Sequence, residues 1–408
     1  MSYQFDRDAA IERYENCNER ALRWMLARAP LQNGYLNTKM NSITLEDYTN
    51  SDGMRGPKYT YGWIQGRGLE AIASHAVYYS DRDTALSAAL DIVGKRLYKL
   101  LTELQVGDGH VYFCYDANMV PVRQTEGGVI VPQHRLEDVY TYSDAFAAKG
   151  LVAAAARYAP EDLPTHLIYL SRVVQAISGG RFQMAEKVAL GLDSISGQPN
   201  DYGPRMILLG ACGMLERIGQ PNHATFGREF IEHTLKHHYD EESGLLKNIP
   251  GCDACNLGHG IELVGFALDY DALASDRALT EQLVEILISS FNAGFSEPGI
   301  PLSVSARTSI ALNSYCPWWS LPETIRAAAL ASSITDDPKI LEIWAKAHNA
   351  FFDYYWRNEA PISYQTRDAN GPVDFVPATP DLDPGYHTGL SFLAAINAHS
   401  PKFLNTTR

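Results

Sequence analysis

Apolar residues recur at intervals of three and four positions along most of the chain, a spacing typical of amphipathic helices. The pattern is clearest over residues 9–29, 68–79, 85–104, 143–158, 206–218, 261–270, 279–291 and 340–355. No run of comparable length alternates between apolar and polar residues, as a half-buried strand would. The sequence therefore predicts an all-α fold.

Short glycine-centred segments interrupt this pattern every 55 to 75 residues or so, about the length of two helices with their loops. They are Gly34-Tyr35-Leu36, Gly109-His110-Val111, Gly180-Arg181-Phe182, Gly244-Leu245-Leu246, Gly299-Ile300-Pro301 and a weaker sixth near Pro361-Ile362-Ser363. Six helical pairs close into an (α/α)6 barrel, in which outer helices cover an inner ring. Because no linker or charge block divides the chain, we expect one domain over residues 1–408, with its site at one mouth of the barrel.

The composition, with 46% hydrophobic and 20% charged residues, is that of a folded globular protein. A formal net charge of −14 and the lack of a Lys/Arg-rich run argue against nucleic acid or an anionic membrane as partners. The N-terminal residues do not resemble an export signal, and no apolar run is long enough to span a membrane. These features predict a cytoplasmic protein.

Six cysteines are present, and only Cys252 and Cys255 form a CxxC pair. Without an export signal, reduced thiols are expected rather than disulfides. A zinc site built from Cys252, Cys255 and His259 would lack a fourth ligand, so loop cysteines are the simpler interpretation. We expect neither a metal ion nor a cofactor.

Two polar segments at the starts of apolar helices carry candidate chemistry. Trp63 and Arg67 lie one helical turn apart, and together they suit a sugar, with its oxygens on the arginine and its apolar face on the ring. A buried salt bridge is the alternative role for Arg67. His259 and Glu262 share a helical face, so Glu262 can fix the tautomer of His259 or share proton transfer with it. A hydrogen-bonded core histidine is the alternative there.

Two further segments lie late in the chain. Trp318 and Trp319 are followed by Glu323, an arrangement that suits either a saccharide platform or a packed core. His387 opens the last apolar helix, and nothing local separates it from a buried structural histidine.

Taken in order, these four segments resemble the N-acylglucosamine 2-epimerase family, which includes renin-binding protein, cellobiose 2-epimerases and mannose isomerases. The resemblance covers nearly the whole chain. It rests on Trp-x-Gln-Gly-Arg at 63–67, Gly-His-x-x-Glu at 258–262, Trp-Trp followed by an acid at 318–323, and a histidine at 387. It implies an (α/α)6 barrel in which two histidines move the C2 proton of an open-chain sugar.

By this resemblance, His259 and His387 act as general acid and base, since a group with a pKa near neutrality can both take and return a proton. Arg67 is the candidate partner for the enediolate oxygens. The candidate catalytic residues are His259, His387, Arg67, Glu262 and Glu323, and the candidate substrate-binding residues are Trp63, Gln65, Trp318, Trp319 and Tyr386.

The chain departs from the family pattern at two positions. Many members have an arginine three residues after the final histidine, where this chain has Leu390, so one expected substrate contact is absent. Cellobiose epimerases and some mannose isomerases have a further histidine where this chain has Ile207. We therefore expect several neutral hexoses, or a substrate with a local apolar group, rather than a strict N-acetylglucosamine preference. No phosphate-binding loop supports a nucleotide effector.

Three functions stay open at this level. The first is a C2 epimerase or an aldose–ketose isomerase. The second is a glycoside hydrolase that pairs acids among Asp144, Asp201, Glu262 and Glu323 at about 5 to 9.5 Å, which leaves the histidines unexplained. The third is a sugar-binding relative without turnover. The partner expected in each case is a small sugar, and a homodimer is the assembly that we consider.

Overall fold

Helices form the framework of the protein in the computed structural model, which describes residues 5–375, 379 and 381–399. The longer helices are α1 (Arg7–Ala27), α2 (Gly62–Tyr78), α3 (Thr84–Asp108), α4 (Tyr142–Tyr158), α5 (Leu163–Ser178), α9 (Phe226–His238), α10 (Leu257–Leu268), α12 (Arg277–Gly294), α13 (Ser320–Ser332) and α14 (Pro338–Ala350). The shorter ones are α6 (Leu192–Ile195), α7 (Gly203–Leu209), α8 (Cys212–Arg217), α11 (Asp271–Ala274) and α15 (Ser391–Ala398), with the 3₁₀ turns η1 (Gln32–Gly34), η2 (Asn50–Arg55) and η3 (Pro221–His223) and the π-helical turns η4 (Phe351–Tyr355) and η5 (Tyr386–Leu390).

Short strands lie in the connections between helices and pair only locally. They are β1 (Val122–Gln124), β2 (Ile130–Pro132), β3 (Tyr140–Thr141), β4 (Phe182–Gln183), β5 (Tyr239–Asp240), β6 (Leu245–Leu246), β7 (Ala254–Cys255), β8 (Ser303–Ser305), β9 (Ala311–Asn313), β10 (Cys316–Pro317), β11 (Thr366–Asp368) and β12 (Gly371–Pro372). The sheets are β1-β2, β5-β6, β7-β8-β9 and β10-β11-β12, all antiparallel, and the parallel pair β3-β4.

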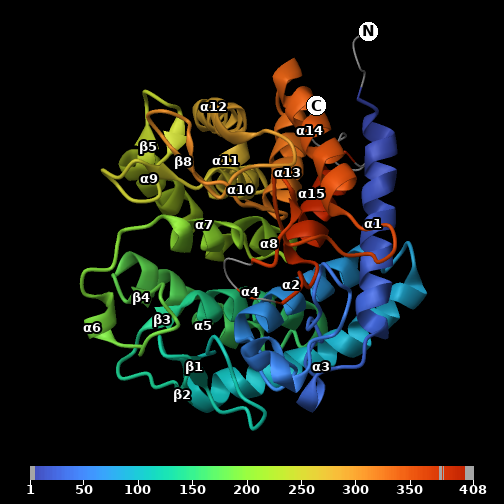
Figure 1. Ribbon diagram of the computed structural model, residues 1–408, viewed down its shortest axis with the longest axis vertical. Helices are drawn as coiled ribbons and strands as arrows, with labels where there is room; N and C mark the ends of the chain where they lie inside the picture. Colours follow the sequence, from blue (N-terminus) through green and yellow to red (C-terminus); the bar gives the residue numbers. More distant parts are fainter. Residues whose placement is uncertain (1–4, 376–378, 380, 400–408) are drawn as a thin grey trace.

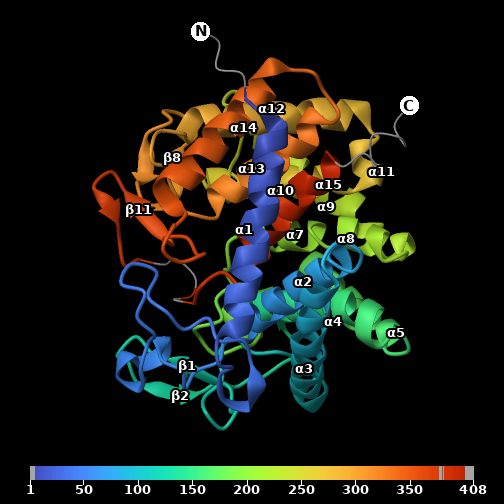
Figure 2. The same ribbon diagram turned by 90° about the vertical axis from the view of Figure 1, so that its right-hand side faces the viewer.

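The helices pack as two concentric rings (Figure 1). The inner ring consists of α2, α4, α7–α8, α10, α13 and η5–α15, and η5 returns against α2 to close it. The outer helices α1, α3, α5, α9, α12 and α14 cover this ring, and Figure 2 shows α1 running along the outside of the molecule. This arrangement is the predicted (α/α)6 barrel.

The inner helices α2 and α4 touch through glycine. A Cβ atom at Gly66 would lie 2.6 Å from the carbonyl carbon of Phe146, and one at Gly150 would lie 2.4 Å from the carbonyl oxygen of Gly66. Only glycine permits this backbone approach. It brings the first two turns of α2, which carry Trp63 and Arg67, against the start of α4.

Helix boundaries differ from the sequence prediction in instructive ways. Helix α2 begins at Gly62 rather than at position 68, and the helix predicted over 206–218 is divided into α7 and α8 at Gly210, where a side chain would collide with the ring of Phe266. The prediction also omitted α5, α9 and α13. Helix α13 is alanine-rich and buried almost all round, so it lacks the polar face that marks an amphipathic helix.

The glycine-centred segments do mark the connections between helices. Gly34, Gly109, Gly180 and Gly244 have φ values of +96°, +73°, +70° and +71°, a region that glycine enters without strain. Gly299 is not in this region and forms instead a bridge with Ser296. The repeat is therefore confirmed at four of its five stronger positions as a turn signal.

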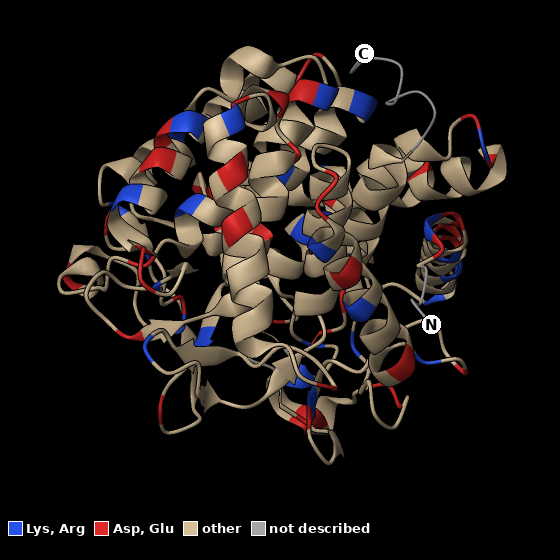
Figure 3. Cartoon of the chain, turned by 90° about the horizontal axis from the view of Figure 1, so that it is seen from above, with Lys and Arg blue, Asp and Glu red and all other residues tan. Residues whose placement is uncertain are grey.

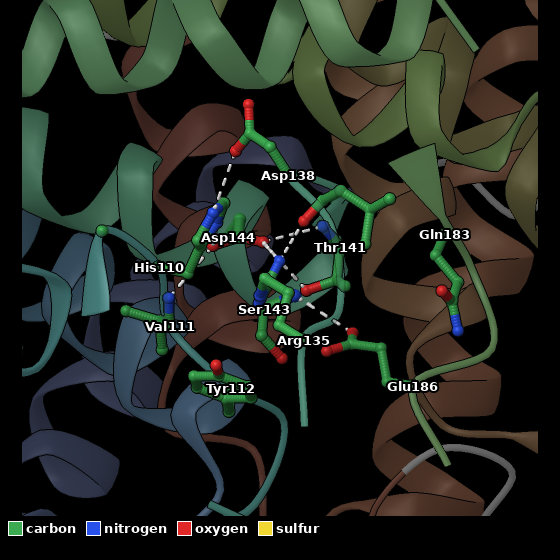
Figure 4. A network of polar contacts seen from close by, with 12 residues as sticks. His110, Val111, Tyr112, Arg135, Asp138, Thr141, Ser143, Asp144, Gln183 and Glu186 are labelled. Carbon is green, nitrogen blue, oxygen red and sulfur yellow. Dashed lines mark hydrogen bonds and ion pairs between the residues drawn. The ribbon is translucent and has the colours of Figure 1, made fainter. Parts of the chain in front are cut away.

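A buried polar network holds the connections against the start of α4 (Figure 4). The Asp144 carboxylate accepts hydrogen bonds from the backbone N–H groups of Val111 at 3.0 Å and Thr141 at 2.8 Å, and from the Tyr169 hydroxyl at 2.6 Å. Burial acts to raise the pKa of Asp144, but the charge of Arg135, the contact with His110 and the hydrogen bond from Tyr169 outweigh it and lower the pKa to about 2. Asp144 is thus a structural anchor, and it leaves the set of candidate hydrolytic acids.

The outer surface mixes both signs of charge. In the view of Figure 3, Lys and Arg residues are interspersed with Asp and Glu residues on the outer helices. Within the described residues, no helix is both long and apolar enough to cross a membrane. None of the six cysteines forms a disulfide, as the sequence predicted.

Candidate active site

A cavity of about 560 Å³ opens where the N-terminal turns of the inner helices converge. Helix α2 contributes Trp63 and Arg67 to its wall, and η5 contributes His387. The remaining inner helices and their connections contribute Tyr142, Phe146, Met206, Ile207, His259, Glu262, Trp318 and Trp319. Seven of the ten residues singled out from the sequence therefore line one cavity, although they are spread over more than 300 positions of the chain.

His387 is held by a buried carboxylate. Its Nδ1 lies 2.9 Å from Oε1 of Glu323 and 3.9 Å from Oε1 of Glu262. The other carboxylate oxygen of Glu323 lies 2.9 Å from Nη1 of Arg326. With Glu323 ionised, Nδ1–H of His387 donates to it, which leaves Nε2 unprotonated and able to act as a base.

His259 has a different environment. The Asn256 side chain caps α10 by accepting a hydrogen bond from the His259 backbone N–H at 3.1 Å, while Nδ1 of the ring is buried without a partner among the described residues. The Trp319 ring lies 5.3 Å from that of His259 and 5.7 Å from that of His387, so it is a neighbour of both. The expectation that Glu262 orients His259 is wrong, because Glu262 lies beside His387 instead.

The two glycines beside His259 have different surroundings. A Cβ at Gly258 would lie 2.6 Å from the Trp319 ring, so this glycine makes room for the tryptophan rather than for a ligand. At Gly260 a Cβ would meet only the Ser290 hydroxyl, at 3.4 Å. The absence of a side chain at Gly258 thus allows the Trp319 ring to pack beside the His259 ring.

Arg67 is held by aromatic rings. Its guanidinium carbon lies 4.9 Å from the Trp63 ring centroid, 4.1 Å from that of Phe146 and 5.2 Å from that of Tyr386. Its Nε is buried without a hydrogen-bond partner among the described residues. Burial lowers the pKa of Arg67, yet a guanidinium stays charged at neutral pH. The side chain is therefore a buried cation in the cavity wall, where its charge can balance negative charge on a ligand.

Burial makes both histidines weak bases in the empty cavity. It lowers the pKa of His259, which Asp201 partly offsets, and it lowers the pKa of His387 well below the ordinary value, with Arg67 adding to the effect. Both imidazoles are thus neutral at neutral pH. Each imidazole can accept a proton. The resulting imidazolium is stable only when a nearby negative charge balances it.

The two carboxyl groups beside His387 are shifted the other way. Burial raises the pKa of Glu262 to about 8, and the proximity of Glu323 adds to this shift. Burial also raises the pKa of Glu323, to about 7, but Arg326 opposes the rise. At neutral pH Glu262 is therefore mostly protonated, and Glu323 is the member of the pair that ionises first.

Three predicted residues do not line the cavity. Glu323 lies behind His387, as described above. The Gln65 amide is used by the backbone of Leu36, with hydrogen bonds of 2.9 Å and 3.2 Å, so its position supports the fold rather than a substrate contact. Tyr386 lies beneath Arg67, where its hydroxyl accepts a hydrogen bond from Nζ of Lys149 at 2.6 Å.

Leu390 also lies elsewhere than the sequence suggested. It lines a second, smaller cavity on the far side of Tyr386, together with Glu70, Arg217, Asp269 and Arg326. Ile207, in contrast, lines the main cavity. Of the two departures from the family pattern, the structure thus places only the one at position 207 in the wall of the main cavity.

The polar residues Asn248, Asn256 and Asp383 of the cavity wall were not singled out from the sequence, and Asp201 was named only as a candidate hydrolytic acid. Asp201, Asn248 and Asn256 form a hydrogen-bonded row beside His259, in which Asn248 donates to Asp201 at 3.3 Å. Asp383 accepts hydrogen bonds from the backbone N–H groups of η5 and so positions His387. Asn256 and Asp383 just before a helix are the usual signal for a cap, which could have identified them.

One group of three donors is close enough for a metal ion. Among the described residues only Glu262, Glu323 and His387 form such a set, with donor atoms within 4.8 Å of one another, and Cys252 and Cys255 belong to none. The charges of Arg326 and Arg67 already act to lower the pKa of both carboxyl groups, and the His387 imidazole is hydrogen-bonded to Glu323. We therefore interpret the set as an acid–base cluster.

The fold and cavity define an (α/α)6-barrel protein with a buried histidine–carboxylate site. Solved structures with this fold include the cellobiose 2-epimerase from Bacillus thermoamylovorans, with a TM-score of 0.72 and 15% identity over 96% of this chain and 99% of that chain. A D-mannose isomerase gives a TM-score of 0.71 and 12% identity over 97% and 100% of the two chains.

Glycosidase-type barrels are less similar. A possible member of the GH105 family from Salmonella enterica gives a TM-score of 0.57 and 10% identity over 98% of this chain and 97% of that chain. No protein-family model matches the sequence, and no curated protein matches it significantly. At such low identities the similarity establishes the fold, and the activity has to be argued from the site.

Proposed function

We propose that this protein is a sugar isomerase that moves the C2 proton of a free aldose through an enediolate. The observation that carries the proposal is the pair of buried, neutral histidines in one cavity with Arg67, a buried cation. Neutral imidazoles are suitable bases for a carbon acid whose conjugate base is stabilised by a cation at its oxygen.

In the proposed reaction, Nε2 of His387 takes the proton from C2 as the C2–H electron pair moves toward the C1 carbonyl. Arg67 holds the negative oxygen of the resulting enediolate. Glu323 stabilises the imidazolium that forms, because its carboxylate already accepts Nδ1–H of His387. For inversion, His259 first takes a proton from water and returns it to C2 from the opposite face, and His387 releases the proton it took to water. Return of the proton from His387 to C1, as the O2 proton moves to O1, gives a ketose.

The structural neighbours support this proposal through their common fold. They include a cellobiose 2-epimerase and a D-mannose isomerase at TM-scores of 0.72 and 0.71, above the glycosidase-type barrels at 0.51 to 0.57. Hydrolysis would need two carboxyl groups on either side of a glycosidic bond. Here Glu262 and Glu323 both lie against His387, with oxygen atoms within 4.8 Å of one another. That arrangement disfavours the hydrolase.

The test is incubation with free aldoses and with cellobiose in heavy water, followed by NMR. We expect deuterium at C2 together with the C2 epimer or the ketose. Release of glucose from cellobiose without C2 exchange would establish the hydrolase instead. Saturable binding of a sugar with neither reaction would leave a sugar-binding protein, and either result would overturn the proposal.

A further inference from the structure

Arg326 is a buried cation beside the acid–base cluster, outside the wall of the main cavity. It lies one helical turn after Glu323 on α13, and its Nη1 is 2.9 Å from Oε2 of Glu323. Only 4% of Arg326 is exposed, and Glu323 is fully buried. A charge pair this deeply buried is costly unless each partner compensates the other.

The Arg326 side chain packs against Gly265 and Phe266 of the neighbouring helix α10. A Cβ at Gly265 would lie 3.1 Å from Cδ of Arg326, and the guanidinium carbon lies 4.8 Å from the Phe266 ring centroid. Arg326 approaches Glu323 from the side of the smaller cavity, which it lines with Leu390 and Tyr386. It does not line the main cavity. Arg326 can therefore act on a substrate only through Glu323.

We propose that Arg326 is a positioning residue that acts on His387 through Glu323, in the order Arg326, Glu323, His387. The charge of the arginine, paired with one carboxylate oxygen, keeps Glu323 ionised, so that the other oxygen accepts Nδ1–H of His387. The catalytic nitrogen Nε2 is then the unprotonated one. This inference rests on the proposed function, because it assigns a role within that same reaction.

Other charged groups also face Glu323, and none replaces Arg326. Lys149 on α4 donates to the Tyr386 hydroxyl and pairs with Glu70 at 3.4 Å. Arg67 on α2 lies over aromatic rings in the main cavity. Glu262 on α10 is a like-charged group when ionised, and the proximity of Glu323 raises the pKa of Glu262. Among the described residues, Arg326 is the cation with a direct ion pair to Glu323.

Loss of the arginine charge has a definite sign. Burial raises the pKa of Glu323, and Arg326 opposes that rise, so its removal moves the pKa upward. An opposite charge at this distance typically shifts a pKa by about one to three units. At neutral pH Glu323 would then be protonated and would donate to Nδ1 of His387. The proton of the neutral imidazole would move to Nε2, and the base would be lost.

The test uses the full chain with ¹⁵N-labelled histidine and the variants Arg326→Gln, Arg326→Met and Arg326→Lys. The matched control is Arg217→Gln, since Arg217 lines the same small cavity but pairs with Asp269 at 2.8 Å. Imidazole ¹⁵N shifts report the pH at which His387 changes from the Nε2–H to the Nδ1–H tautomer. The pH profile of C2 exchange is the second readout.

We expect the Gln and Met variants to move the tautomer midpoint, and the acidic limb of the exchange profile, upward by about one pH unit or more. The Lys variant and the Arg217→Gln control should stay near the wild type. The Met variant keeps the test available if the Gln variant does not fold. An unchanged midpoint in a folded variant without the charge would overturn the inference. The tautomer of His387 is measured without substrate, so the two proposals can fail separately. A wild type that is inactive on every sugar would refute the proposed function, while the ¹⁵N shifts would still show whether Arg326 controls the tautomer of His387.

Discussion

The two histidines of the cavity lie in unlike surroundings. Nδ1 of His387 lies 2.9 Å from Oε1 of Glu323, and Oε2 of Glu323 lies 2.9 Å from Nη1 of Arg326. The carboxyl group of Glu262 is also close to His387. His259 has an orphaned Nδ1 and only the more distant charge of Asp201 to raise its pKa. The ionised Glu323 carboxylate can balance an imidazolium at position 387, whereas His259 has no carboxylate hydrogen-bonded to Nδ1 among the described residues; burial and Arg67 nevertheless lower the pKa of His387 well below its ordinary value.

This difference indicates a division of work in the proposed reaction. His387 can store a proton during turnover because an anion balances its charge. His259 has no such anion in hydrogen-bond contact at Nδ1, which suits a group that delivers a proton and exchanges with water. The following predictions test this division, beginning with the largest effect.

Replacement of either histidine by alanine should reduce C2 exchange by about 10²- to 10⁴-fold, the usual contribution of a proton-transfer group. His134→Ala, at an exposed position, is the matched control and should retain full activity. Thermal unfolding should show that all three variants are folded. A near wild-type rate in His259→Ala or His387→Ala would remove that residue from the mechanism.

The two glutamates should respond unequally to an isosteric amide. Glu323→Gln removes the anion beside His387, so we expect a loss of at least about a hundredfold in kcat. Glu262→Gln should cost less than about tenfold at pH 7, because burial keeps Glu262 largely protonated there and an amide is also neutral. The wild-type rate should rise with pH through about 7, where Glu323 ionises. Equal losses in the two variants would contradict the unequal roles.

Substrate preference should depend on position 207 and not on position 390. A panel of N-acetylglucosamine, N-acetylmannosamine, glucose, mannose, fructose and cellobiose should show several neutral sugars accepted. We expect Ile207→His to change the ratios of kcat/KM within this panel by roughly tenfold, since Ile207 lines the cavity. Leu390→Arg should scale all rates together, because it lies beside Arg326 in the smaller cavity. A preference for N-acetylmannosamine about a hundredfold above every neutral hexose would refute the expectation of a neutral sugar.

Exhaustive chelation of metal ions should leave the rate of C2 exchange unchanged, the smallest effect of the series. The donors of Glu262, Glu323 and His387 could approach a metal ion, but a metal would occupy the nitrogen that hydrogen-bonds to Glu323. Activity is measured after dialysis against a chelator and again after zinc is added. A loss that zinc restores would replace the proposed role of Glu323 by metal coordination.

Much of the architecture was accessible from the sequence. The three- and four-residue periodicity predicted an all-helical chain, and glycines with positive φ at positions 34, 109, 180 and 244 mark the connections of the barrel. These signals are local, so a single sequence contains them. Helix α13 was missed because a helix buried on every side has no polar face to reveal its period.

The membership of the cavity was also largely predicted, since seven of the ten candidates line it. What the sequence determined is which residues are candidates for the chemistry: histidines, acids and an arginine at helix starts. Only the tertiary structure decided how they pair. Glu262 is three residues from His259, yet it lies beside His387, and Gln65 shares a motif with Arg67, yet it serves the backbone of Leu36.

The physical reason is that spacing along one helix specifies a shared face but not what that face meets. The partner of His387 comes from α13, and the partner of that carboxylate is fixed by the room that Gly265 leaves on α10. Such contacts depend on how separate helices pack, and burial then sets the pKa of each group by the charges it happens to meet. The chain thus specifies its reactive groups locally, and the barrel assigns each of them its partner.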